Sequence, residues 1–110
     1  MDTLEAMNSC IAMRYLKPDP LPRDTVRTLV HAATRASSPG NSQGWEFVII
    51  DDAGLKADFG AAVGAAMAPV FAHRPSDLPG PLERMYRGAE HLASHFANVP
   101  VWILGCGRKV

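Results

Sequence analysis

Only two stretches of this 110-residue chain have the character of β-strands, and this limits the folds that it can adopt. Residues 45–50 read WEFVII, and residues 99–104 read VPVWIL, in which Pro100 is tolerable only near the start of a strand. Both runs predict strands that are buried on both faces. Two strands alone rarely make a stable sheet. We therefore expect one of two things: further strands come from a partner chain, or residues 1–110 are part of a longer single domain.

Apolar residues recur at helical spacing in four segments of the chain. The first is a short helix over residues 3–13, for which Asp2 or Thr3 is the expected cap. The second covers residues 23–35. The third follows Asp52, which can cap it, and is expected to end at Pro69. The fourth, from Leu82 to Phe96, has the most regular apolar stripe, and the proline-rich residues 74–81 before it predict a mobile or ligand-binding loop.

Charge and cysteine content narrow the possible functions. Eleven Lys and Arg balance eleven Asp and Glu; zero net charge argues against nucleic acid as the main partner and favours self-association. Two cysteines without CxxC spacing favour free thiols in the cytoplasm. The N-terminus lacks a signal-peptide pattern. The most apolar stretch, residues 61–72, is shorter than the ~20 residues that a membrane span needs, so no membrane association is expected.

The stretch ASSPGNSQGWEFVII at residues 36–50 joins a polar loop to the first strand. Pro39 and Gly40 interrupt the preceding helix and allow positive φ. Asn41, Ser42 and Gln43 then supply amide and hydroxyl groups that both donate and accept hydrogen bonds. Such a loop can grip a flat ligand with polar edges. An ordinary helix-to-strand connection explains the same residues equally well.

Three segments together resemble the FMN-dependent nitroreductase family. They are KPDPLP at residues 17–22, AATRA at residues 32–36, and SSPGNSQGWEFVI at residues 37–49. The family pattern in the last segment is Asn-Ser-Gln-Pro-Trp-x-Phe followed by a β-branched strand; Gly44 stands here where proline is usual. Residues 82–105 also resemble the next helix and strand of the family, so the similarity covers most of the chain.

The resemblance implies an α+β fold with a central, mainly antiparallel sheet flanked by helices. This fold would be incomplete here, because the chain matches the N-terminal part of the family domain. Two such chains would form an intertwined homodimer. It implies FMN at the dimer interface, NADH or NADPH as the electron donor, and a small-molecule acceptor such as a nitroaromatic or a quinone. Hydride goes to the flavin itself, so we assign no catalytic acid or base; the protein supplies position and electrostatics.

The resemblance also implies which residues bind the cofactor. Asn41 matches the asparagine that contacts the flavin ring, and Ser37 and Ser38 match small polar residues near the flavin, contributed partly across the dimer. Gln43 either joins them or braces the loop. Arg14 keeps one charge of the N-terminal motif that holds the ribityl chain and phosphate; its alternative is a surface charge near a helix C-terminus.

Two positions depart from that N-terminal motif. Cys10 and Ala12 stand where the family commonly has an arginine and a serine. Losing one charge-assisted bond to the phosphate costs roughly 1.5–3 kcal/mol. This departure supports a second hypothesis, in which the chain is a non-catalytic nitroreductase-like scaffold that has lost flavin and acts as a binding or dimerisation module.

The remaining chemically interesting residues have simpler interpretations. His91 and His95 have a spacing that can hold a metal, but no third ligand is evident, so we expect a solvated helix face and no metal site. Trp45 and Trp102 are expected to be core residues of buried strands. Cys106 has no neighbouring base and is interpreted as structural.

Overall fold

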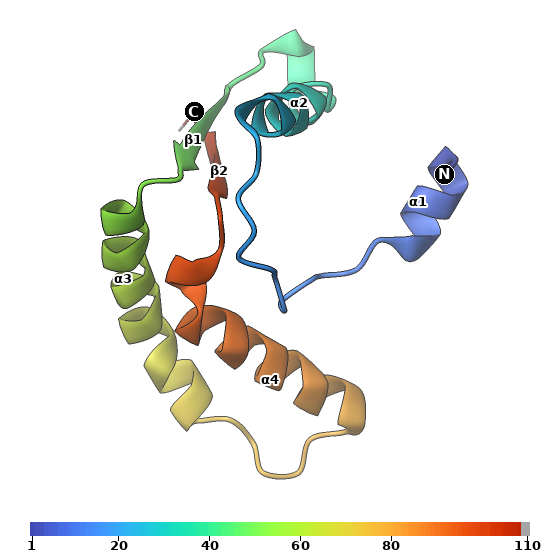
Figure 1. The fold of residues 1–110 in the computed structure, drawn as a ribbon. Helices are drawn as coiled ribbons and strands as arrows, with labels where there is room; N and C mark the ends of the chain where they lie inside the picture. Colours follow the sequence, from blue (N-terminus) through green and yellow to red (C-terminus); the bar gives the residue numbers. More distant parts are fainter. Residues whose placement is uncertain (109–110) are drawn as a thin grey trace.

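The two predicted strands pair with each other in the structure, a computed structural model that describes residues 1–108. β1 (Trp45–Ile50) and β2 (Trp102–Gly107) form an antiparallel sheet in which Trp45 lies opposite Gly107 and Ile50 lies opposite Trp102 (Figure 1). β2 begins three residues later than expected and extends through the glycine-rich tail. Pro100 has no N–H to donate to a ladder, so residues 99–101 lead into the strand without pairing.

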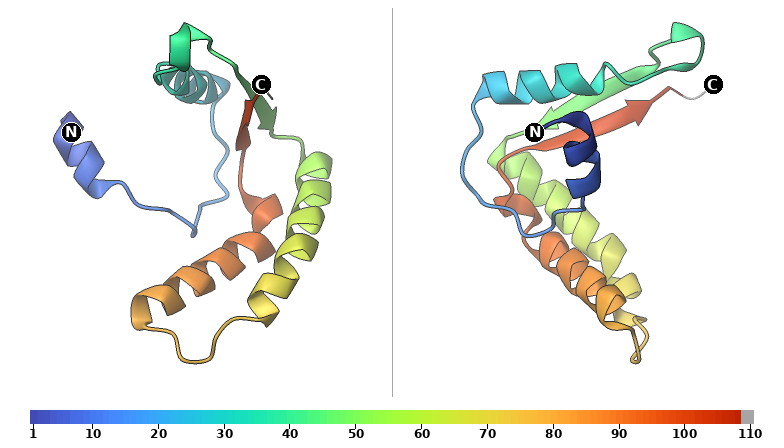
Figure 2. Two further views of the ribbon diagram at one scale, coloured as in Figure 1. Left: turned by 180° about the vertical axis from the view of Figure 1, so that it is seen from behind. Right: turned by 90° about the vertical axis from the view of Figure 1, so that its right-hand side faces the viewer.

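The expectation that both faces of these strands are buried is wrong for this chain. Val48 is 47% exposed and Ile49 is 40% exposed. One helix, α2 (Arg23–Ala33), runs beside the sheet (Figures 1 and 2), and side chains of α2 and β1 line cavities between the two elements. A sheet of two strands with one helix on one side has too few neighbours to cover its apolar side chains.

The best-packed part of the molecule lies where the two long helices meet the start of β2. α3 (Ala53–Ala72) and α4 (Gly80–Ser94) form a helical hairpin, and the short 3₁₀ helix η2 (Phe96–Asn98) connects α4 to the strand (Figure 1). Phe96 and Val99 are the buried hydrophobic residues of residues 1–108, at 6% and 7% exposure. Phe59 of α3 meets the ring of Phe96 edge to face, at a centroid distance of 5.1 Å.

The helix caps agree with the sequence, but several helix ends do not. Asp2 caps α1 (Thr3–Ser9) in a capping box with Glu5, and Asp52 accepts from the backbone N–H of Leu55 at 2.9 Å. α1 ends at Ser9 instead of residue 13 because nothing covers its apolar side chains; Met7 is 69% exposed. α2 ends at Ala33, two residues early.

Pro69 does not end α3, as the sequence predicted, because the helix continues to Ala72. Proline removes the backbone donor to the carbonyl group one turn earlier, but its fixed φ of about −65° is itself helical, so the residues after it can continue the helix. The Pro69 carbonyl oxygen accepts from the backbone N–H of His73 at 3.1 Å. The full helix has 20 residues and a mean hydropathy of 1.2, so by length and composition it could cross a membrane. The expectation that the segment is too short is therefore wrong, although core helices of soluble proteins pass the same test. α3 packs against α4 and η2.

The N-terminal segment is the least attached part of the fold. α1 stands apart from the rest of the chain, and an extended connector leads from it past α4 to α2 (Figures 1 and 2). Pro18, Pro20 and Pro22 keep this connector extended, as expected. Pro22 is also the N-cap residue, immediately before α2. This path carries residues 10–16 to α4 and places α2 beside the sheet.

Candidate functional site

The loop before β1 has a defined geometry that depends on three residues with positive φ. The short 3₁₀ helix η1 (Pro39–Asn41) contains Gly40 at φ 59°, and Asn41 and Gln43 have φ of 53° and 47°. Positive φ is uncommon for residues other than glycine and persists where surrounding contacts hold it. The loop of residues 37–43 is therefore held in a specific conformation.

Two side-chain hydrogen bonds hold that conformation. Ser38 Oγ accepts from the backbone N–H of Gln43 at 3.1 Å, and Gln43 Nε2 donates to Asn41 Oδ1 at 2.9 Å. Ser38 is half-buried, whereas Ser37, Asn41 and Gln43 are exposed. Gln43 thus braces the loop, which was one of its two predicted roles. The Asn41 side chain is exposed, and its Nδ2 group has no hydrogen bond within residues 1–108, so this group can donate to a ligand.

Arg14 lies against α4, far from this loop along the chain. Its stem packs on Gly88, which is buried; a Cβ at Gly88 would lie 3.1 Å from Arg14 Cδ. The half-buried Arg14 lines a cavity of about 200 Å³ together with His91, His95 and Asn98. No carboxylate of residues 1–108 forms an ion pair with its guanidinium. Arg14 is therefore placed to meet an anion.

His91 lies in α4, and His95 is the C-cap residue of this helix. The sequence predicted that both side chains are solvated, but His91 is not. His91 is half-buried and stacks with Tyr15 at a centroid distance of 4.4 Å and with His95 at 4.1 Å. His95 is exposed, and its Nδ1 lies 2.9 Å from the His91 carbonyl oxygen. No group of three or more metal-ligating side chains occurs in the described part of the chain. The Tyr15–His91 contact joins segments that are distant in the sequence, so no local sequence pattern predicts it.

The strand tryptophans and the cysteines also differ in burial from the predictions. Trp45 and Trp102 are half-buried, although Trp102 belongs to the packed cluster around Phe96. Cys10 and Cys106 are free and exposed. The prediction that Cys106 is a structural residue is therefore not supported, because its thiol is exposed.

One chain does not bring the predicted cofactor-binding residues together. Residues 37–43 lie beyond α2 at one end of the molecule, whereas α4, against which Arg14 packs, lies at the other end (Figure 1). The chemistry of the donor set fits FMN: an amide and hydroxyl loop suits the ring edge, and a guanidinium without a carboxylate partner suits the phosphate. Within residues 1–108, however, these two groups do not form one binding site.

Comparison with known proteins decides the family. Residues 9–109 match the family described as "Nitroreductase family". The chain belongs to the nitroreductase family. The match includes Arg14, the residue 37–43 loop and both strands, and it confirms the resemblance drawn from the sequence. Comparison with curated proteins gives no match.

A solved structure supports the same fold for this nitroreductase-family chain. It is similar to the crystal structure of oxidized iodotyrosine deiodinase bound to FMN and 3-iodo-L-tyrosine, with a TM-score of 0.71 and 17% sequence identity. The alignment covers 93% of this chain and 54% of the deiodinase chain, so this chain spans about half the length of that relative. The nitroreductase-like α+β fold is thus confirmed as a partial domain, and the family and its FMN-bound neighbour support a flavin-related oxidoreductase fold.

Proposed function

We propose that this chain forms the N-terminal part of an FMN-dependent oxidoreductase that takes electrons from NADH or NADPH. It passes them to a small acceptor such as a nitroaromatic or a quinone. The observation that carries the proposal is the family match over residues 9–109, which includes the NSQGWEF segment. FMN would supply the hydride chemistry, and the protein would supply binding and orientation.

The chain's own residues have separate roles in this proposal. The outward amide of Asn41 would meet the polar edge of the flavin ring, and Ser37 would offer a second polar group beside it. Ser38 and Gln43 hold the loop in shape through the bond from Gln43 N to Ser38 Oγ. Arg14 would neutralise the phosphate, because its guanidinium has no carboxylate partner among residues 1–108.

The separation of Arg14 from the loop supports a homodimer. Residues at opposite ends of one chain can act on one ligand when two copies pack so that the loop of one faces the connector of the other. The large exposed apolar surface also favours self-association; Leu4, Ile11 and Leu55 are 71%, 69% and 59% exposed. The exposed free thiols suit a reducing cytoplasm, which is where we place the protein.

Visible absorbance of the purified protein tests the function. We expect flavin absorbance bands that bleach when NADH or NADPH is added without oxygen. Asn41→Ala and Arg14→Gln should each weaken FMN binding about tenfold or more, since each removes a polar contact to the cofactor. Arg35→Gln is the control, because Arg35 is an exposed arginine outside the proposed site. Protein that is colourless and takes up no added FMN would overturn the proposal for this chain.

A second candidate function is a flavin-free scaffold that binds another protein or a small ligand. The observation that favours it is the pair Cys10 and Ala12 in the N-terminal motif, both exposed on the loosely attached connector. The double variant Cys10→Arg/Ala12→Ser distinguishes the two. Gain of FMN binding by this variant alone would show that the site is intact except for its phosphate contacts and that the natural chain has lost the cofactor.

A further inference from the structure

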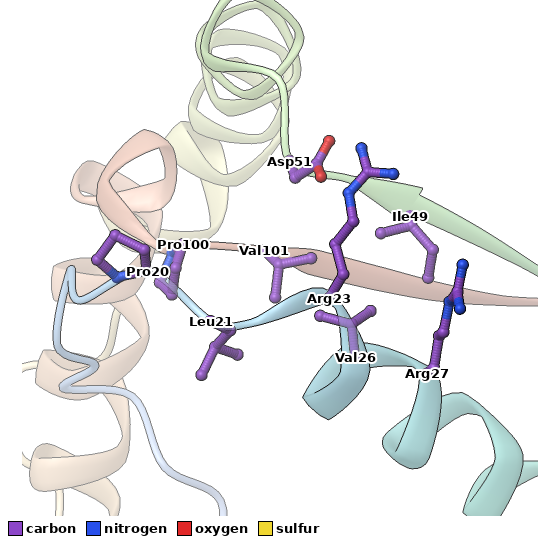
Figure 3. A pocket seen from close by; sticks show the side chains of 9 residues that line it. All are labelled: Pro20, Leu21, Arg23, Val26, Arg27, Ile49, Asp51, Pro100 and Val101. Atoms are coloured by element: carbon purple, nitrogen blue, oxygen red, sulfur yellow. The ribbon is translucent and has the colours of Figure 1, made fainter.

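A second group of charged residues, separate from those assigned to flavin, surrounds a cavity between α2 and the sheet. The cavity measures about 490 Å³ and lies where the proline connector enters α2 (Figure 3). Small-molecule pockets commonly occupy roughly 300–1,000 Å³ and have apolar walls with a few polar groups. Four aliphatic side chains contribute to these walls: Leu21, Val26, Ile49 and Val101.

Two arginines form the charged side of this cavity. Arg23 begins α2 and Arg27 follows one turn later, so both project from the same face of the helix. Figure 3 shows both side chains extending from α2 toward β1. Neither guanidinium forms an ion pair with a carboxylate of residues 1–108. Two forked cations beside an apolar wall match an anion that carries an apolar body.

One acidic residue limits the charge of the ligand. Asp51 follows β1 and lines the same cavity, near the end of the Arg23 side chain (Figure 3). Two guanidinium groups and one carboxylate leave a single net positive charge at the cavity. A monoanionic carboxylate balances that charge, whereas a phosphate dianion would leave excess negative charge beside Asp51.

We propose that this cavity, hereafter the α2 cavity, binds a small carboxylate that carries an apolar body. The carboxylate would lie between Arg23 and Arg27, and the apolar body would contact Val26, Ile49 and Val101. The site uses none of the residues assigned to FMN, so it neither requires flavin nor depends on the redox function. A carboxylate bound in the α2 cavity would be a substrate or an effector, and its binding site would be distinct from the flavin loop.

Nuclear magnetic resonance titration of the isotope-labelled protein with 1-naphthoate tests the proposal. We expect saturable shifts at the amides of residues 20–27, 49–51 and 100–101. The uncharged methyl ester and inorganic phosphate should each bind at least tenfold more weakly, since one lacks the charge and the other lacks the apolar body. If the ester binds as tightly as 1-naphthoate, the site is only a hydrophobic surface. If phosphate binds as tightly, the site is only an unspecific anion contact. Either result overturns the proposal.

Three variants give the expected charge signature. Arg27→Gln should weaken 1-naphthoate binding about tenfold, and Asp51→Asn should tighten it about threefold because it removes a like charge. Arg35→Gln lies on the same segment but outside the α2 cavity and should change nothing. All three side chains are exposed, so folding should survive, and the dispersion of the amide spectrum verifies this. Unchanged affinity in both Arg27→Gln and Asp51→Asn, or shifts confined to other residues, would overturn the proposal.

Discussion

Phe96 and Trp102 lie face to face, with ring centroids 3.9 Å apart and planes only 8° from parallel. The indole Nε1 of Trp102 also donates to the Phe96 carbonyl oxygen at 3.0 Å. Phe96 lies in η2, directly after the helical hairpin, and Trp102 begins β2, so a ring stack and a hydrogen bond join the two. Since Phe96 is one of the few buried side chains of residues 1–108, this pair fixes the sheet to the helices.

Truncating Phe96 should therefore detach the sheet from the hairpin. We expect Phe96→Ala to lower the free energy of unfolding by about 3–4 kcal/mol, because it removes both aromatic contacts and leaves a cavity. Trp102→Phe keeps a ring but loses the N–H donor, so it should cost about 1–2 kcal/mol. Urea unfolding followed by circular dichroism measures both. Equal losses in the two variants would contradict the separate roles of ring and hydrogen bond.

Two glycines of α3 should respond in opposite ways to alanine. A Cβ at Gly60 would lie 3.3 Å from both Cβ and Cδ1 of Phe96, whereas a Cβ at Gly64 would meet nothing within 4 Å. Gly64→Ala should raise the free energy of unfolding by about 1 kcal/mol through helix propensity alone. Gly60→Ala has the same propensity gain but pushes against the buried ring, so it should be neutral or destabilising. Thermal unfolding of the matched pair gives the difference directly.

The cap of α3 gives a third prediction. Asp52→Ala removes the acceptor for the Leu55 N–H and should destabilise the protein by about 1 kcal/mol. Asp52→Asn retains a side-chain oxygen at the same position and should lie within about 0.5 kcal/mol of the natural protein. Chemical unfolding compares the two. If asparagine proves as damaging as alanine, the carboxylate charge and not the hydrogen bond stabilises this helix end.

The bracing of the flavin loop can be tested without touching the predicted ring contact. Ser38→Ala removes the acceptor for the Gln43 N–H and should speed hydrogen exchange at Gln43 and weaken FMN binding several-fold. Ser42→Ala is the matched control, since the Ser42 hydroxyl is exposed and makes no hydrogen bond within residues 1–108. Faster exchange with unchanged FMN affinity would show that the loop conformation does not matter for the cofactor.

Local sequence signals predicted the elements of the fold well. Asp2 and Asp52 cap helices as their spacing indicated, because a cap depends on residues within one turn. β1 occurs where apolar β-branched residues cluster, and β2 overlaps the second predicted run at residues 102–104. Pro69 misled the prediction because proline disturbs the turn before it, whereas its own φ is helical and the residues after it can continue the helix. The end of α1 was misplaced because an apolar stripe predicts a helix only when some surface covers it.

The candidate site was less predictable, because it depends on contacts between distant segments. The packing of Arg14 on Gly88 and the stack of Tyr15 on His91 join the connector to α4, and spacing within either segment does not reveal them. The cavity beside Arg23 and Arg27 was missed for the same reason. The sequence shows two arginines one turn apart, but only the fold places Ile49 and Val101 in the same cavity. Family resemblance identified Arg14 and Asn41, and it could not show that one chain holds them apart.

Within residues 1–108, each strand of the sheet has one neighbour, so each also has one row of backbone donors and acceptors without a described strand beside it. Such an open border is a template on which another extended segment can add. A newly made chain with these borders and exposed Val48 and Ile49 would be captured by whichever strand reached it first. The rate at which such pairings form, and not only the stability of the folded chain, would then decide how much of this protein escapes aggregation.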